Sequence, residues 1–316
     1  MQEKILVIGA CGQIGTELTL ALRQKYGNEN VIASDIKEES PLFAGTGPFI
    51  KLDAMDAAAI RALVKREKIT TIYLLAALLS VTGETNPALC WGLNMGALRQ
   101  ILDLGMAEKL KIFWPSSIAV FGATTPRENT PQKTIMEPTT MYGVTKYSGE
   151  LLCQYYHKKF GLDVRSVRYP GLISWKSEPC GGTTDYAVEI FYEAIKMGKY
   201  TCFLSENTYL PMMYMDDAIR ATLELMDVPL EKIKSRMSYN LSAISFSPKE
   251  IAEEIKKYIP NFKMSYAPDQ RQAIADSWPA SIDDSTARAD WGWKHEYDLP
   301  KMVKVMLENL TEKLSK

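Results

Sequence analysis

Short apolar runs alternate with amphipathic stretches through the first half of the chain. The runs of strand length are Lys4–Ile8, Val31–Ser34, Phe49–Leu52, Thr71–Ala76, Leu110–Pro115 and Val164–Tyr169. Between them, apolar residues at helical spacing predict helices at about Gln13–Tyr26, Asp56–Arg66, Pro87–Met106 and Met141–Lys159. Strands and helices that alternate in this way form a parallel sheet, and right-handed crossovers place the helices on both of its faces. We therefore predict an α/β fold with a doubly wound parallel sheet.

After Gly171 the pattern changes to separate helices joined by short strands and loops. These helices are expected at about Asp185–Lys196, Met215–Met226, Pro248–Tyr258 and Pro300–Lys313. We expect residues 1–171 to form the sheet domain and residues 172–316 to form a smaller α+β substrate-binding region, from which some segments can return to the first domain. Because doubly wound sheets bind ligands at the carboxyl ends of their strands, we expect the cleft between the sheet and this C-terminal region.

Composition narrows the class of partner to a small molecule. The 316 residues include 37 Lys and Arg against 38 Asp and Glu, so no overall attraction to nucleic acid or to an anionic membrane is expected. No apolar stretch reaches the roughly 20 residues of a membrane helix, and the chain begins directly with a predicted strand, so we expect a cytoplasmic protein. Five cysteines without a C-x-x-C pair and two distant histidines argue against a metal site and against a Ser-His-Asp hydrolase.

A glycine-rich segment, GACGQIG, follows the first predicted strand and opens the first helix. Gly9, Gly12 and Gly15 have G-x-x-G-x-x-G spacing. Glycine there permits a tight turn, close approach of the backbone to a pyrophosphate, and packing of the helix against the strand. The free N–H groups at the helix N-terminus then hold the phosphate. The sheet domain is therefore predicted to be a Rossmann domain that binds a dinucleotide.

An acidic residue, Asp35, ends the second predicted strand, 20 residues after Gly15. A carboxylate at this place accepts from both hydroxyls of the adenosine ribose and repels a 2′-phosphate, which favours NAD over NADP. The nearby Lys37 leaves NADP open, and Asp35 could instead only cap a turn. Asp53, at the end of the third strand, could accept from the adenine amine or could likewise be a turn residue.

A Tyr-x-x-x-Lys pair places a phenol and an ammonium group on one face of a helix. The ammonium favours the phenolate, and oxidised nicotinamide adds to the positive field, so that a phenol with a reference pKa of about 10 can act as a base. Four pairs fit this spacing: Tyr142/Lys146, Tyr155/Lys159, Tyr192/Lys196 and Tyr297/Lys301. Only Tyr142 follows a strand that ends in two serines, KIFWPSS, within the sheet domain. We predict that Ser117 donates to the substrate oxygen, that Tyr142 accepts its proton, and that Lys146 also holds the nicotinamide ribose.

The segments GACGQIG, PSSIAVFG and YGVTK together resemble the extended short-chain dehydrogenase/reductase superfamily over essentially the whole chain. RYPGLIS, GGTTDYA, LPMMYMDDAIRAT, QAIADSWP and DDSTARADWGW more narrowly resemble the short-chain type of L-threonine 3-dehydrogenase, which is distinct from the zinc-dependent type. The resemblance implies NAD-dependent oxidation of the threonine hydroxyl to 2-amino-3-ketobutyrate in threonine catabolism. Ser117, Tyr142 and Lys146 would be the catalytic residues.

The same resemblance implies further site residues. Substrate contacts are expected from Ser80, Ser117, Tyr142, Thr184 and Trp278. Ser80 could instead be a turn residue, Thr184 a helix cap, and Trp278 part of the core. The expected NAD site comprises Gly9, Gly12, Gln13, Ile14, Gly15, Asp35, Asp53, Leu75, Ala76, Ala77, Asn94, Tyr142, Lys146 and Tyr169. A homodimer is also implied, with the helices around Pro87–Met106 and Met141–Lys159 packed as a four-helix bundle.

Two other functions use the same cofactor signal. A nucleotide-sugar epimerase or dehydratase would have to bind a diphosphate, for which bidentate arginine is the efficient donor. Between Gly171 and Asp216 the chain has no arginine, which favours a small zwitterion, over which the GGTTDY and DSWP segments are expected to close. A non-catalytic NAD sensor would have no need for the intact set of Ser117, Tyr142 and Lys146.

Overall fold

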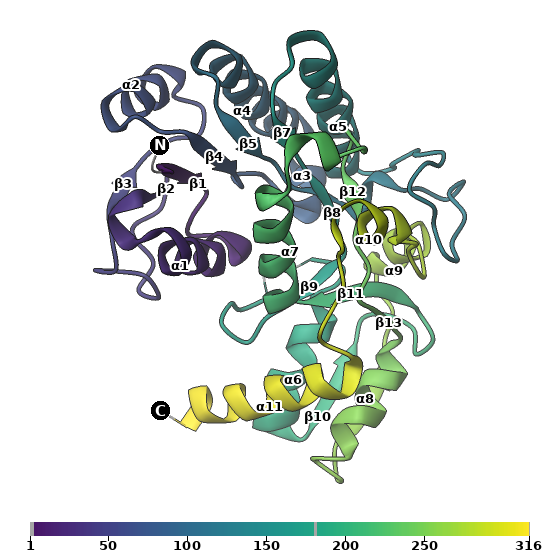
Figure 1. The fold of residues 1–316 in the computed structure, drawn as a ribbon. Helices are drawn as coiled ribbons and strands as arrows, with labels where there is room; N and C mark the ends of the chain where they lie inside the picture. Colours follow the sequence, from purple (N-terminus) through teal and green to yellow (C-terminus); the bar gives the residue numbers. More distant parts are fainter. Residues whose placement is uncertain (1–2, 180–181, 316) are drawn as a thin grey trace. The chain divides into compact units, whose positions relative to one another are not determined.

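The computed structural model describes residues 3–179 and 182–315 (Figure 1). The chain divides into two compact units. Unit 1 comprises Met1–Ser117, Thr140–Arg168 and Ile219–Tyr239, and unit 2 comprises Ile118–Thr139, Tyr169–Ala218 and Asn240–Lys316. A single boundary near residue 171 therefore describes the chain incompletely, because residues 118–139 belong to unit 2 and residues 219–239 return to unit 1.

Unit 1 is built on a six-stranded sheet in the order β3-β2-β1-β4-β5-β7, and all of its strand pairs are parallel. The strands are β1 (Ile5–Ile8), β2 (Val31–Asp35), β3 (Phe49–Lys51), β4 (Thr71–Leu74), β5 (Lys111–Phe113) and β7 (Val164–Arg165). This confirms the predicted doubly wound Rossmann sheet. The strand order reverses between β1 and β4, and in open α/β sheets ligands bind beside the carboxyl ends of such strands.

Four helices of unit 1 follow the predicted ranges closely, whereas the short helix α3 (Ser80–Thr85) was not predicted. The four are α1 (Gln13–Tyr26), α2 (Ala57–Glu67), α4 (Pro87–Glu108) and α5 (Met141–Phe160). Helices α4 and α5 pack against each other and share one buried cluster with the sheet, to which α4 contributes Leu98 and α5 contributes Cys153. Helix α7 (Met215–Asp227) was expected in the C-terminal region, but from Ile219 onward it belongs to unit 1.

The predicted strand Val164–Tyr169 is in fact two strands that belong to different sheets. β7 ends at Arg165, and β8 (Val167–Tyr169) lies between β6 (Ser116–Ser117) and β12 (Tyr239–Asn240) in a separate three-stranded sheet. The single residue between β7 and β8, Ser166, is buried, and its hydroxyl pairs with that of Ser238 at 2.6 Å. The predicted strand thus covers two short strands, both of which are buried.

Unit 2 combines small sheets with helices. β9 (Gly171–Ile173), β11 (Leu210–Tyr214) and β13 (Ile244–Phe246) form a mixed sheet, and β10 (Lys199–Cys202) pairs in parallel with β14 (Lys263–Tyr266). Helix α6 (Tyr186–Met197) packs against α8 (Pro248–Lys256) and α11 (Leu299–Ser315), as Figure 1 shows. Two shorter helices are α9 (Arg271–Asp276) and α10 (Ser285–Trp291). Among the described helices, none combines the length and apolar character needed to cross a membrane.

Candidate active site

The glycine-rich loop lies between β1 and α1, and its three glycines differ in what they permit. Gly9 has φ +92°, and a Cβ there would lie 2.5 Å from the Ala76 backbone nitrogen. A Cβ on Gly15 would lie 2.2 Å from the Gly9 carbonyl oxygen. Gly12, in contrast, is exposed, and a Cβ there would meet only that oxygen, at 3.4 Å. The fold therefore requires the outer two glycines, whereas Gly12 keeps the outer surface of the loop free of side chain.

The exposed surface of this loop is also the N-terminus of α1. Gly12 is the N-cap residue, and no side chain caps the helix. Gln13 and Ile14, which follow it, are partly exposed. Backbone N–H groups at an uncapped helix N-terminus, together with the helix dipole, favour an anion. A dinucleotide pyrophosphate fits these donors.

Asp35 is buried where β2 ends, close to the glycine-rich loop. Its carboxylate accepts the backbone N–H of Cys11 at 2.9 Å and that of Lys37 at 3.0 Å. A carboxylate offers about four acceptor positions, so two backbone bonds leave capacity for two ribose hydroxyls. Asp53 is different: it is exposed, and its carboxylate accepts from the Met55 N–H at 2.8 Å in a local turn.

The loop after β4 lies beside the glycine-rich loop. The N–H groups of Leu75 and Ala76 donate to the Ile8 carbonyl at 2.8 and 3.0 Å, and Ala77, which follows them, is partly exposed. Asn94, buried on α4, holds this loop in place by accepting from the Leu78 N–H at 2.9 Å and donating to the Leu78 carbonyl at 3.1 Å.

Asn94 also connects the loop to α5. Its amide donates to the Thr145 hydroxyl at 3.0 Å. Asn94 therefore joins α4 to the β4 loop and to α5. No local sequence pattern indicates that this residue bridges the β4 loop and α5.

Helix α5 begins with a capped turn that fixes the catalytic candidates. The Thr140 hydroxyl accepts the Gly143 N–H at 3.1 Å, and Tyr142 and Lys146 follow one turn apart. The ammonium of Lys146 is buried and donates to the Pro115 carbonyl at 2.6 Å. Its Nζ lies 5.5 Å from the centre of the Tyr142 ring and 4.6 Å from that of the Trp114 ring.

Ser117 completes the arrangement. Its hydroxyl is hydrogen-bonded to that of Tyr142, from the end of β6. The structure thus brings together the three residues that the sequence singled out. It adds Trp114 and Pro115, to which the sequence assigned no role although both stand in the KIFWPSS segment.

Burial controls the protonation of this group. It raises the pKa of Tyr142 to about 12, an effect that the hydrogen bond from Ser117 partly offsets. Burial lowers the pKa of Lys146 to about 8, while Cys153, Cys90 and Glu150 act in the opposite direction. The sequence led us to expect that the ammonium favours the phenolate. In the chain alone, desolvation outweighs this attraction, because loss of water disfavours both the phenolate of Tyr142 and the ammonium of Lys146.

The candidate substrate residues are distributed over both units. Ser80 of unit 1 is buried and is the first residue of α3, rather than part of a turn. Thr184 of unit 2 packs its methyl group on Gly171, where a Cβ would approach it to 2.7 Å. It is not a helix cap, because the N-cap residue of α6 is Asp185, whose carboxylate accepts the Gly182 N–H at 2.8 Å.

Two aromatic candidates are buried in unit 2. Trp278 follows α9, and its N–H donates to the Ala275 carbonyl at 3.1 Å; only 7% of the residue is exposed. Tyr169 is the last residue of β8 and is 4% exposed. Both side chains are therefore buried in this structure.

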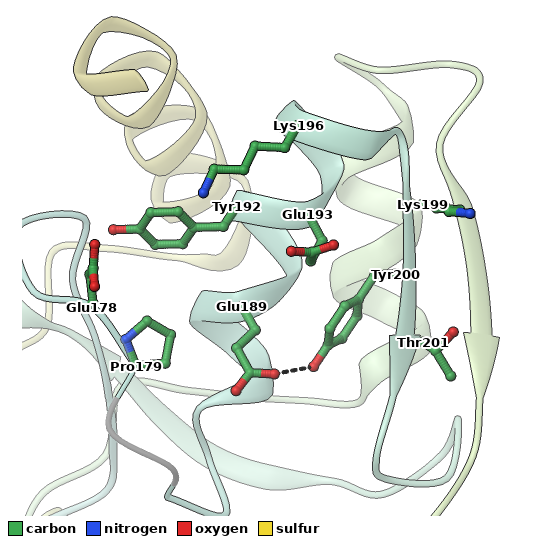
Figure 2. A pocket seen from close by; sticks show the side chains of 9 residues that line it. All are labelled: Glu178, Pro179, Glu189, Tyr192, Glu193, Lys196, Lys199, Tyr200 and Thr201. Atoms are coloured by element: carbon green, nitrogen blue, oxygen red, sulfur yellow. Dashed lines mark hydrogen bonds between the residues drawn. The ribbon is translucent and has the colours of Figure 1, made fainter. Parts of the chain in front are cut away.

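Unit 2 also carries an open cavity of about 690 Å³ beside α6 and β10 (Figure 2). The Tyr200 hydroxyl at its wall donates to the Glu189 carboxylate at 2.8 Å. The residues that line it are Glu178, Pro179, Glu189, Tyr192, Glu193, Lys196, Lys199, Tyr200 and Thr201. None of the predicted site residues is among them.

A parallel sheet of this strand order, with a glycine-rich loop after its first strand, defines the Rossmann-type fold. More particularly, the chain belongs to the NAD dependent epimerase/dehydratase family, whose model matches residues 5–242. An uncharacterized epimerase/dehydratase of Staphylococcus haemolyticus is 53% identical over an alignment of 315 residues, and the match covers 98% of this chain and 98% of that one.

Among solved structures the chain is similar to L-threonine dehydrogenases. The holo form of a GalE-like L-threonine dehydrogenase from Cupriavidus necator is 55% identical, with a TM-score of 0.95 over 97% of this chain and 99% of that one. An L-threonine dehydrogenase from Clostridium difficile is 50% identical, with a TM-score of 0.96 over 99% and 98%. These matches confirm the resemblance that the sequence motifs indicated.

Proposed function

We propose that the chain is an NAD-dependent L-threonine 3-dehydrogenase. It oxidises the side-chain hydroxyl of L-threonine to give 2-amino-3-ketobutyrate, NADH and a proton. The observation that carries the proposal is the contact of Ser117, Tyr142 and Lys146 within the Rossmann unit. Full-length similarity to L-threonine dehydrogenases supports the choice of substrate.

The residues of unit 1 suit NAD. The N-terminus of α1 at Gly12 would hold the pyrophosphate, Asp35 the adenosine ribose, and Lys146 the nicotinamide ribose. When bound, NAD supplies the hydride acceptor and a positive charge on the nicotinamide. Because burial raises the pKa of Tyr142 to about 12 in the chain alone, a positive charge near the phenol is what the site needs.

The roles of the side chains follow from their contacts. Ser117 donates to the substrate hydroxyl oxygen and orients it toward Tyr142. The Tyr142 oxygen accepts the hydroxyl proton as the alcohol becomes a ketone. Lys146, held by the Pro115 carbonyl and the Trp114 ring, keeps its charge beside the phenolate.

The arginines of unit 2 already have partners within the protein, which supports a compact substrate over a diphosphate. Arg127 donates to the Asp276 carbonyl, Arg271 pairs with Asp269, and Arg288 pairs with Asp284. A diphosphate would compete with these bonds for the guanidinium groups. As further parts of the proposal, Ser80, Thr184 and Trp278 contact threonine, and the segments 181–186 and 276–279 close over it; Gly181 lies outside the described residues.

A homodimer and a cytoplasmic location are also part of the proposal. Several large apolar side chains of α4 and α5 are exposed, and such surfaces are typical of protein interfaces. They are Leu89, Trp91, Leu151, Tyr155 and Phe160. Sedimentation of the purified protein at the mass of one chain would contradict the dimer.

The test of the proposed activity is NADH formation, followed by absorbance, with L-threonine, L-serine, L-allo-threonine and 3-hydroxybutyrate. We expect L-threonine to have the highest kcat/KM, and NADP to replace NAD poorly. Interconversion of a nucleotide sugar without net NADH, and no reaction with L-threonine, would instead indicate an epimerase.

A further inference from the structure

One face of α5 is bonded, turn by turn, to the short segment that carries Ser117. We call this face, formed by Tyr142, Lys146 and Glu150, the catalytic face of α5; its members are four residues apart and therefore lie in one row. Tyr142 is hydrogen-bonded to Ser117, and Lys146 donates to the Pro115 carbonyl at 2.6 Å. The first two turns of the row thus hold the two ends of the segment 115–117.

The third turn holds the middle of that segment. The Ser116 hydroxyl donates to Glu150 Oε1 at 2.6 Å. Arg168 on β8 donates to the same carboxylate through Nε, at 2.9 Å to Oε1, and through Nη2, at 2.7 Å to Oε2. One carboxylate therefore links α5, β6 and β8, and β6 and β8 are also neighbouring strands.

The Glu150–Arg168 ion pair is removed from water. The side-chain exposures of Arg168 and Glu150 are 1% and 0%. Stability alone does not account for such a pair, because buried ion pairs can often be replaced by apolar side chains with no loss of stability. Its bidentate geometry, however, fixes the direction in which the carboxylate meets Ser116.

We propose that Glu150 is a positioning residue of this site. By holding Ser116, its carboxylate fixes the strand that carries Ser117 against the catalytic face of α5. Its negative charge also favours the ammonium form of Lys146. The expected effect on kcat rests on the proposed function. The expected effect on hydrogen exchange of the segment rests on the geometry alone.

The charge effect has a defined direction. The Lys146 ammonium lies beside the Tyr142 and Trp114 rings and the Pro115 carbonyl, and it interacts electrostatically with Cys153 and Glu150 on α5 and with Cys90 on α4. Cys153, Cys90 and Glu150 all oppose the loss of the ammonium, and Glu150 contributes the least of the three. Removing its charge should therefore cause the ammonium to be lost at a lower pH, so that the alkaline limb of the kcat profile moves to lower pH.

Three variants test the proposal. Glu150→Gln keeps an oxygen for Ser116 but removes the charge. Ser116→Ala removes the hydroxyl and leaves the ion pair intact. Asp163→Asn is the matched control, because Asp163 accepts from a different buried arginine of unit 1, Arg165, at 2.8 Å and has no contact with the catalytic face.

We expect Glu150→Gln and Ser116→Ala each to lower kcat by about tenfold or more, with KM for NAD changed less than about twofold. Only Glu150→Gln should move the alkaline limb. Both should speed hydrogen exchange of the backbone amides of residues 116 and 117, which is a readout independent of activity. Asp163→Asn should do none of these. A folded Glu150→Gln protein with wild-type kcat, pH profile and exchange would overturn the proposal, as would equal effects of Asp163→Asn.

Should Glu150→Gln fail to fold, the double variant Glu150→Met/Arg168→Met decides, because it leaves no unpaired buried charge. A folded double variant with lowered kcat supports the proposal, and one with wild-type kcat overturns it. If this protein also fails to fold, Ser116→Ala decides in the same way. Absence of NADH formation by the wild-type protein would overturn the proposed function instead, and the exchange data would still test the positioning role.

Discussion

The ammonium of Lys146 lies 5.5 Å from the ring centre of Tyr142, which precedes Lys146 by one turn of α5. Both side chains are buried, which makes the ammonium and the phenolate unfavourable. Burial lowers the pKa of Lys146 to about 8 from its usual 10.5. The charge that the proposed chemistry requires is therefore maintained at the expense of stability. This relationship leads to a prediction about folding as well as about catalysis.

Replacing Lys146 by Met should stabilise the protein at pH 7 while abolishing most activity. At about 1.4 kcal/mol per pH unit, the depressed pKa corresponds to about 3 kcal/mol, and loss of the hydrogen bond to Pro115 offsets about 1 kcal/mol of it. We expect a gain of about 2 kcal/mol in unfolding free energy and a fall in kcat of at least about 100-fold. Urea unfolding and NADH formation measure the two effects.

The stability difference should also depend on pH. The folded-state pKa of Lys146 lies below the unfolded one, so the cost is fully present below pH 8 and disappears as pH rises toward 10.5. Lys159→Met is a matched control, because Lys159 forms an exposed Tyr-x-x-x-Lys pair on the same helix. A Lys146→Met protein that is less stable than wild type at pH 7, or a pH-independent difference, would contradict the assignment.

Asp35 and Asp53 allow a paired test of the cofactor site. Asp35→Asn removes the charge proposed to accept from the ribose, so we expect KM for NAD to rise by about 10- to 100-fold and the preference over NADP to decrease. Asp53→Asn alters an exposed turn and should change KM for NAD less than about twofold. The check is KM for each dinucleotide at saturating L-threonine. Equal effects of the two substitutions would refute the different roles.

The glycine-rich loop offers a second pair. Gly12→Ala adds a Cβ that meets only the Gly9 carbonyl at 3.4 Å, so the Tm should change by less than about 3 °C while NAD binding is weakened. Gly15→Ala would place a Cβ 2.2 Å from the same oxygen and should lower the Tm far more. Thermal unfolding with and without NAD separates the two. If Gly12→Ala binds NAD like the wild type, the phosphate does not sit on this loop.

Sequence periodicity predicted the long helices and missed several of the short elements. Helix α1 was predicted over its whole length, Gln13–Tyr26, because 14 residues carry a clear apolar stripe. Strand β6 has only two residues, too few for any alternation to be recognised. The strands from β9 to β14 were expected only in general terms.

The candidate site divides in a similar way. Ser117, Tyr142 and Lys146 could be chosen because local spacing and the preceding strand distinguish them. Contacts such as Glu150 with Ser116, which are 34 residues apart, depend on how helix and strands pack and leave no local pattern. The raised pKa of Tyr142 was also not predictable, since it follows from burial by distant parts of the chain.

The central claim is that the Tyr142 oxygen accepts the proton of the threonine hydroxyl. It is tested most directly by kcat for NADH formation from L-threonine in Tyr142→Phe, beside Tyr155→Phe, which changes the exposed tyrosine of the second pair on the same helix. We predict that Tyr142→Phe folds normally and loses at least about 100-fold in kcat, with Tyr155→Phe close to wild type. A folded Tyr142→Phe protein with near wild-type kcat would contradict the account.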